Sequence, residues 1–242
     1  MSMKKVLSSG REERLSVCRQ RRSYLAPAWP WVVILGVDGS GKSSVLQSLA
    51  ARFEAAPVAG VKIVHRRPGV VYSARDGDSG AVAHYSKPAH GKVKSTLKLA
   101  AMILDWLFGY WSQLAYQRAK GYLLFSDRHS LLDLLVDPLR YRYNGPSWMV
   151  RLALRCVPMP DLVLLLDAPV HVLQARKREL APEEATRQRN AYLELMATLP
   201  NSTIIDVARP LNQVVADVEQ SILDFVKLSP QDFGGINEMR DT

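Results

Sequence analysis

Two classes of protein are disfavoured by what this 242-residue sequence lacks. It has only two cysteines, Cys18 and Cys156, with no CxxC pair and no zinc-site spacing, which fits a reducing cytoplasm and no disulfide framework. Its most apolar stretch, residues 97–116, contains Lys98 and Asp105 and falls short of the ~18 unbroken apolar residues that a membrane helix needs. We therefore expect a cytoplasmic protein without a transmembrane segment.

The basic start of the chain also has no following apolar region, so the sequence does not predict a secretory signal. Residues 1–30 hold seven lysines and arginines against Glu12 and Glu13, a net of +5 out of +9 for the whole chain. A charge of this sign suits nucleic acid, an acidic membrane or a pocket for two polyanionic nucleotides, and it does not choose among them. We expect a flexible basic arm over residues 1–30, with a transit sequence as the weaker alternative.

The composition, 48% hydrophobic and 23% charged, fits one globular α/β domain, which we place at residues 31–229, with a tail at residues 230–242. Short apolar runs alternate with stretches of helical period, which indicates parallel βαβ units. The fold class expected is therefore α/β, a three-layer sandwich with a central, mostly parallel sheet and helices on both faces. Strands are predicted at residues 31–35, 61–65, 122–126, 162–166 and 202–206, and helices at residues 44–53, 93–120, 170–180, 182–199 and 211–228.

The long helix at residues 93–120 carries several aromatic side chains near its middle, which we assign mostly to the core: Trp106, Phe108, Tyr110 and Trp111. The polar stretch before it, residues 73–92, has no clear period and is predicted to be a loop or a lid-like insertion.

The strongest motif is residues 31–44, WVVILGVDGSGKSS, in which an apolar run feeds a glycine-rich turn that matches GxxxxGK[ST]. In this P-loop, or Walker A motif, backbone N–H groups close around phosphate oxygens and Lys42 reaches the β- and γ-phosphates. Ser43 can ligate Mg²⁺ through its hydroxyl. No asparagine of the chain is followed by lysine, so the NKxD motif of GTPases is missing. The sequence therefore predicts an ATP site and argues against a GTPase switch.

With this loop, three further motifs in order resemble those of thymidylate kinases and, more loosely, nucleoside monophosphate kinases. Residues 66–69, RRPG, are similar to that family's REPG turn, residues 127–129, DRH, to its DRY motif, and residues 160–169, PDLVLLLDAP, to its PDLxxxLDxP. Residues 176–178 and 187–193 resemble its lid. The resemblance implies a P-loop nucleoside monophosphate kinase-like fold with a lid.

The resemblance also implies the roles of site residues. Asp38 would hold the acceptor's sugar, Arg66 and Arg128 its phosphate, and Asp127 would lie near Mg²⁺. Gly39 stands where some members carry an arginine, so catalytic charge would come from the lid. The expected sites are catalytic Lys42, Asp127, Arg176, Arg178 and Arg187; nucleotide-binding Gly36, Asp38, Gly39, Ser40, Gly41, Lys42, Ser43 and Ser44; acceptor-binding Asp38, Arg66 and Arg128; and metal-binding Ser43 and Asp127.

One segment departs from the family. Where thymidylate kinases carry the residues that hold thymine, this chain reads LLDLLVDPLRYRY over residues 131–143. We expect an ATP- and Mg²⁺-dependent phosphotransferase acting on a nucleoside monophosphate. The alternatives are a sugar or glycan-precursor acceptor, or a non-catalytic nucleotide-binding protein. No nucleic acid partner is expected, and the sequence leaves open whether the chain forms a homodimer.

Overall fold

The computed structural model describes residues 29–54, 60–65, 90–177 and 180–226. Their centre is a five-stranded sheet in which all strands are parallel, in the order β2-β3-β1-β4-β5. This confirms the α/β class, and each strand begins and ends within one residue of its predicted position. The strands are β1 (Trp31–Leu35), β2 (Val61–His65), β3 (Leu123–Asp127), β4 (Leu162–Asp167) and β5 (Ser202–Asp206).

The three inner strands read as nearly unbroken apolar runs because both faces of the sheet are covered. Every residue of β1 is buried, and so are all residues of β3 and β4 except the aspartates that end them, Asp127 and Asp167. Since the strands are parallel, their carboxyl ends lie at the same edge of the sheet. The two aspartates are therefore delivered to the edge where β1 enters the phosphate loop.

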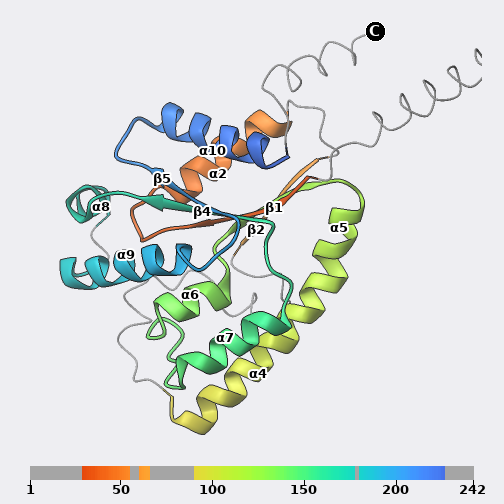
Figure 1. Ribbon diagram of the computed structural model, residues 1–242, viewed down its shortest axis with the longest axis vertical. Helices are drawn as coiled ribbons and strands as arrows, with labels where there is room; N and C mark the ends of the chain where they lie inside the picture. Colours follow the sequence, from red (N-terminus) through yellow and green to blue (C-terminus); the bar gives the residue numbers. More distant parts are fainter. Residues whose placement is uncertain (1–28, 55–59, 66–89, 178–179, 227–242) are drawn as a thin grey trace, which may run out of the picture.

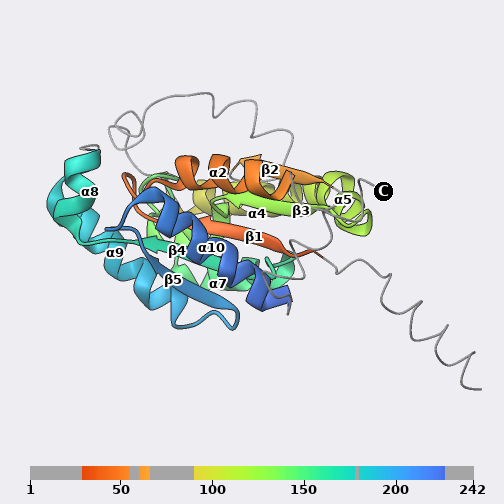
Figure 2. The ribbon, with the colours of Figure 1, turned by 90° about the horizontal axis from the view of Figure 1, so that it is seen from above.

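Helices form a layer on each face of the sheet (Figure 1). On one face lie α2 (Lys42–Glu54) and α10 (Leu211–Val226), which pack against each other. The other face is covered by α4 (Lys92–Gly109), α6 (Ser130–Val136), α7 (Ser147–Cys156) and α9 (Pro182–Met196). A short helix, α8 (Val170–Arg176), follows β4 at the carboxyl edge, as the view from above also shows (Figure 2).

The long predicted helix is present, with one irregularity. It continues from α4 through a π-helical turn, η1 (Tyr110–Leu114), into α5 (Ala115–Ala119), and Gly121, with a φ of +79°, ends it. Trp106 is buried against Trp31, as expected, with ring centroids 5.5 Å apart. The expectation that the aromatics are core is wrong for Phe108 and Trp111, which lie on the helix face away from the sheet and are mostly exposed.

Three further differences from the sequence prediction concern unpredicted helices and the ends of predicted segments. Helices α6 and α7 were not predicted, and the helix expected over residues 170–180 ends at Arg176, because Lys177 is extended with a φ of −153°. Trp29, which the prediction places in the arm, is buried and packs edge-on against Phe53. Among the residues that the structure describes, no helix is long and apolar enough to cross a membrane.

Candidate active site

The phosphate loop joins β1 to α2 and depends on glycine at positions where it touches other elements. Gly36 and Gly39 have φ values of +153° and +93°, which residues with a side chain rarely adopt. A Cβ atom on Gly39 would lie 2.7 Å from the carbonyl oxygen of Leu173 in α8, and one on Gly36 would lie 2.8 Å from that of Leu166. The loop is thus fitted against β4 and α8. An arginine at position 39, as in some thymidylate kinases, would displace α8.

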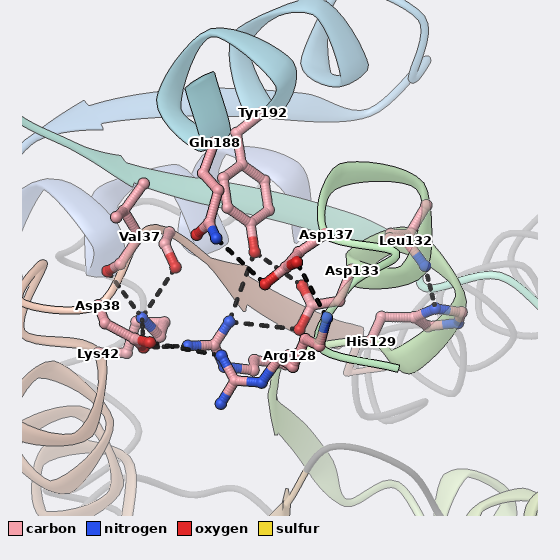
Figure 3. A network of polar contacts seen from close by, with 12 residues as sticks. Val37, Asp38, Lys42, Arg128, His129, Leu132, Asp133, Asp137, Gln188 and Tyr192 are labelled. Carbon is pink, nitrogen blue, oxygen red and sulfur yellow. Dashed lines mark hydrogen bonds and ion pairs between the residues drawn. The ribbon is translucent and has the colours of Figure 1, made fainter. Parts of the chain in front are cut away.

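Lys42 is folded back into this loop. Its Nζ donates hydrogen bonds to the carbonyl oxygens of Gly36 (2.9 Å) and Val37 (3.0 Å), and the residue is buried (Figure 3). Burial, together with the nearby positive charge of Arg128, lowers the pKa of Lys42 to about 7. The ammonium group therefore sits in a site that favours an added negative charge.

Asp38 is surrounded by cations. Its carboxylate accepts hydrogen bonds from Arg128 Nη2 and from Arg140 Nη1 (3.3 Å), and Lys42 Nζ lies 4.0 Å away. Burial alone would raise the pKa of Asp38, but these positive charges and that of Lys177 outweigh it and lower the pKa to about 2. Asp38 is therefore ionised at neutral pH and links the loop to two arginines.

Arg128 occupies the centre of the polar network in Figure 3. It has a φ of +79°, uncommon for a residue with a side chain, and its N–H donates to the carbonyl oxygen of Ile34 beside the loop. The buried guanidinium also donates to Asp133 (3.3 Å) and Tyr192 (3.4 Å), and the Tyr192 hydroxyl donates to Asp133 (2.9 Å). Burial alone would lower the pKa of Arg128. The acids around it outweigh this effect and raise the pKa well above its usual value.

Several members of this network were not singled out from the sequence: Arg140, Asp133, Asp137 and Gln188. Asp133 and Asp137 lie four residues apart in an apolar run, and both are buried. Gln188 of α9 donates to Asp137 (3.1 Å), and the N–H of Arg140 also donates to it (3.1 Å). Two acids in an otherwise apolar run require buried polar partners, and this was the signal available in the sequence.

The predicted metal ligands lie on adjacent elements. Ser43 is exposed in the first turn of α2, and Asp127 ends β3, whose register pairs it with Ile34 of β1. This register places Asp127 beside the end of β1, which leads into the loop. The described residues contain no cluster of three or more histidines, cysteines or acids that could hold a metal. One hydroxyl and one carboxylate fit Mg²⁺, which takes few protein ligands beside nucleotide phosphates.

The predicted lid residues Arg176 and Arg187 each bind other parts of this chain. Arg176 donates to the carbonyl oxygen of Val207 (2.8 Å), beyond the end of β5. Arg187 is bound by Glu184 (2.6 and 2.8 Å) and donates to the carbonyl oxygen of Val136 (3.0 Å), so it holds α9 to α6. Arg66 and Arg178 lie outside the described residues.

Asp167 has a structural partner, since Arg189 binds it through two hydrogen bonds of 2.7 Å. The carboxylate is therefore held by an arginine of α9.

A pocket of about 210 Å³ opens beside the loop. It combines loop and α2 residues with apolar and arginine side chains from α8, from the segment after β5 and from α10. The lining residues are Ser40, Gly41, Ser44, Val45, Arg176, Val207, Arg209, Leu211 and Val214.

This sheet order, with a P-loop after the central strand and an arginine-rich carboxyl edge, defines a P-loop α/β protein of the nucleoside monophosphate kinase-like class. A solved thymidylate kinase from Ehrlichia chaffeensis has the same fold, with a TM-score of 0.57 and 16% identity over 78% of this chain and 96% of that one. No family model matches the sequence.

The sequence comparison finds proteins with the same name as the structural comparison. Proteins named probable thymidylate kinase from Pyrobaculum aerophilum, Thermococcus onnurineus and Thermococcus gammatolerans are 25%, 27% and 28% identical to this chain. The matches cover 80–81% of this chain and 97–98% of the relatives. The resemblance to the thymidylate kinase family, as a divergent sequence, is therefore confirmed.

Proposed function

We propose that this protein transfers the γ-phosphoryl group of ATP to a phosphorylated acceptor that resembles a nucleoside monophosphate. The observation that carries the proposal is the pairing of two anion-attracting groups. Lys42 lies in the phosphate loop, and Arg128 and Arg140 converge on Asp38 beside it. Two such groups side by side suit a donor polyphosphate and an acceptor phosphate, which is what a phosphotransferase must bring together.

On the donor side, Lys42 and the loop N–H groups would bind the β- and γ-phosphates. The pocket beside the loop would take the nucleotide base, with Val207 and Leu211 against the ring and the guanidinium of Arg176 at its edge. Ser43 and Asp127 would hold Mg²⁺, which would supply positive charge to neutralise the phosphates of ATP.

On the acceptor side, Arg128 and Arg140 would bind the phosphate while Asp38 accepts a hydrogen bond from a hydroxyl of the acceptor. In the reaction, an acceptor phosphate oxygen attacks the γ-phosphorus of ATP, and the bond to the β-phosphate oxygen breaks. Little covalent chemistry is asked of the protein, because positioning and charge neutralisation dominate phosphoryl transfer. The products are ADP and an acceptor with a new phosphoanhydride bond.

A non-nucleotide phosphorylated acceptor, such as a sugar phosphate, is the second candidate. The observation that favours it is the buried pair Asp133, on α6, and Asp137, directly after it, in the segment where thymidylate kinases hold thymine. Both acids are already bound by groups of this chain, Asp133 by Arg128 and Asp137 by Gln188. Neither is thus free to read a base in the manner of that family.

A coupled ADP-release assay with a panel of acceptors tests the proposal. The panel contains the deoxynucleoside and ribonucleoside monophosphates and a set of sugar phosphates, with a no-acceptor reaction as background. We expect at least one phosphorylated acceptor to accelerate ADP release, and Lys42→Ala to lower that rate by on the order of 10² or more. Lys62→Ala, at an exposed position of β2, is the matched control and should keep the rate. ATP binding without acceleration by any acceptor would contradict the proposal and favour a non-catalytic nucleotide-binding role.

A further inference from the structure

The two arginines that converge on Asp38 are each held from behind by a buried acid. Arg128 donates through Nη1 to Asp133 (3.3 Å), and the backbone N–H of Arg140 donates to Asp137 (3.1 Å). The two acids lie one helical turn apart, and the N–H of Asp137 donates to the carbonyl oxygen of Asp133 (2.7 Å). The acids therefore fix how both arginines are presented to Asp38.

Helix α9 binds both of these acids, from two positions that are also one turn apart. The Tyr192 hydroxyl donates to Asp133 (2.9 Å), and Gln188 Nε2 donates to Asp137 (3.1 Å). Arg128 Nη1 in turn donates to the Tyr192 oxygen (3.4 Å). Figure 3 shows Gln188 and Tyr192 extending from the same helix toward the two acids. One side of α9 thus carries a partner for each acid.

The contacts form two layers that differ in exposure. The side chains of Asp38 and Arg140 are each 14% exposed, so a molecule that enters the site can reach them. Behind them, Asp133, Gln188 and Tyr192 are 1%, 4% and 2% exposed. The rear layer can therefore influence a bound phosphate only through the arginines in front of it.

Stability alone does not call for this polar rear layer. The segment that carries the acids is otherwise apolar, reading LLDLLVD over residues 131–137. Apolar residues in place of a buried ion pair are often neutral or stabilising. A satisfied polar network instead holds its members in one orientation. Orientation matters most where a planar guanidinium meets a phosphate through two parallel hydrogen bonds.

We infer that Tyr192 and Gln188 are positioning residues that set how the two arginines face the phosphate of the acceptor. The inference rests on the phosphotransferase proposed above, in which Arg128 and Arg140 bind that phosphate. Each positioning residue acts through the acid that it binds. Tyr192 orients the guanidinium of Arg128, and Gln188 orients the backbone of Arg140.

Steady-state kinetics with the compound that gives the fastest ADP release in the acceptor panel tests the inference. Tyr192→Phe removes one hydroxyl and keeps the ring, and Gln188→Met keeps the length of the side chain. We expect each variant to raise the KM for the acceptor about tenfold, the effect of losing one hydrogen bond to a charged group. The KM for ATP should change by less than about twofold. Met196→Leu, buried further along α9, is the matched control and should keep both values.

A double-mutant cycle separates positioning from a general loss of structure. Arg128→Lys removes the fork of donors, so adding Tyr192→Phe should raise the acceptor KM no further if Tyr192 acts through Arg128. A second readout needs no turnover: binding of inorganic phosphate to the chain saturated with ADP, followed by phosphorus NMR. We expect Tyr192→Phe to weaken this binding about tenfold, with unchanged circular dichroism.

A Tyr192→Phe variant with the acceptor KM and the phosphate affinity of the unaltered chain would overturn the inference. So would a KM for ATP that rises as much as the KM for the acceptor, or effects that add in the cycle, because either result indicates a purely structural role. The proposed function fails in a different way. If no acceptor accelerates ADP release while phosphate binding still depends on Tyr192, the positioning role holds and phosphoryl transfer to an acceptor does not.

Discussion

Removing Arg128 tests whether the buried polar network is a set of mutually dependent charges. In Arg128→Met the guanidinium is replaced by an apolar chain, while Asp133 stays 1% exposed with Tyr192 as its remaining partner in the network. Asp38 keeps Arg140 and Lys42 as partners. The main cost is therefore the buried, uncompensated carboxylate of Asp133.

Breaking a buried ion pair from one side costs about 3–5 kcal/mol, whereas replacing both partners with apolar residues is often nearly neutral. We therefore expect Arg128→Met to lower the free energy of unfolding by about 3–5 kcal/mol, and Arg128→Met/Asp133→Leu to recover most of that loss. Arg189→Met is the matched control. It breaks the pair with Asp167 near the surface, where an arginine–carboxylate pair contributes roughly 1 kcal/mol.

Equilibrium unfolding in urea, followed by circular dichroism, gives all three free energies of unfolding. The reasoning is refuted if Arg128→Met costs no more than Arg189→Met. It is also refuted if the Asp133→Leu change adds to the loss instead of reducing it, because Asp133 would then be stable without a cationic partner.

Three further predictions concern protons, acid stability and the amino-terminal residues. Because the pKa of Lys42 is about 7 in the free protein, ATP binding at pH 8 should take up close to one proton, and binding at pH 6 should take up almost none. Calorimetry in two buffers of different ionisation enthalpy measures this, and Lys42→Ala should abolish it. The pKa of Asp38 falls from 3.8 to about 2 on folding, so its contribution to stability is present above pH 4 and is lost as the pH drops through 2. Asp38→Asn should remove that part of the stability–pH curve between pH 4 and 2. Deleting residues 1–28 should leave the melting temperature almost unchanged, and a large drop would mean that they pack as part of the domain.

The fold was accessible from sequence because its determinants are local. Buried parallel strands read as short apolar runs, and the phosphate loop requires glycine and lysine at fixed spacing, so β1, its loop and α2 were predicted almost residue by residue. The positions of Asp127 and Asp167 at strand ends were also predictable, because each aspartate directly follows a short apolar run. Helix α6 was missed because seven residues of mainly leucine, with two acids nearby, have no clear helical period.

The site was only partly accessible because its contacts join distant residues. Arg140 meets Asp38 across 102 positions of the chain, and Tyr192 meets Asp133 across 59. Nothing in the local pattern of Arg140 distinguishes it from Arg142 nearby. The outward orientation of Trp111 was equally hidden, since an apolar residue on a long helix is expected to face the core unless the helix packing is known.

Direct detection of the transferred phosphoryl group tests the central claim most sharply. Phosphorus NMR of a reaction containing the protein, Mg²⁺, ATP and an accepted phosphorylated compound follows ATP, ADP and the acceptor in one spectrum. The account predicts that ADP and a new diphosphate product appear in equal amounts, with no free phosphate, and that Lys42→Ala suppresses both. Release of inorganic phosphate with an unchanged acceptor resonance would contradict it, because the γ-phosphoryl group would then pass to water and not to the acceptor.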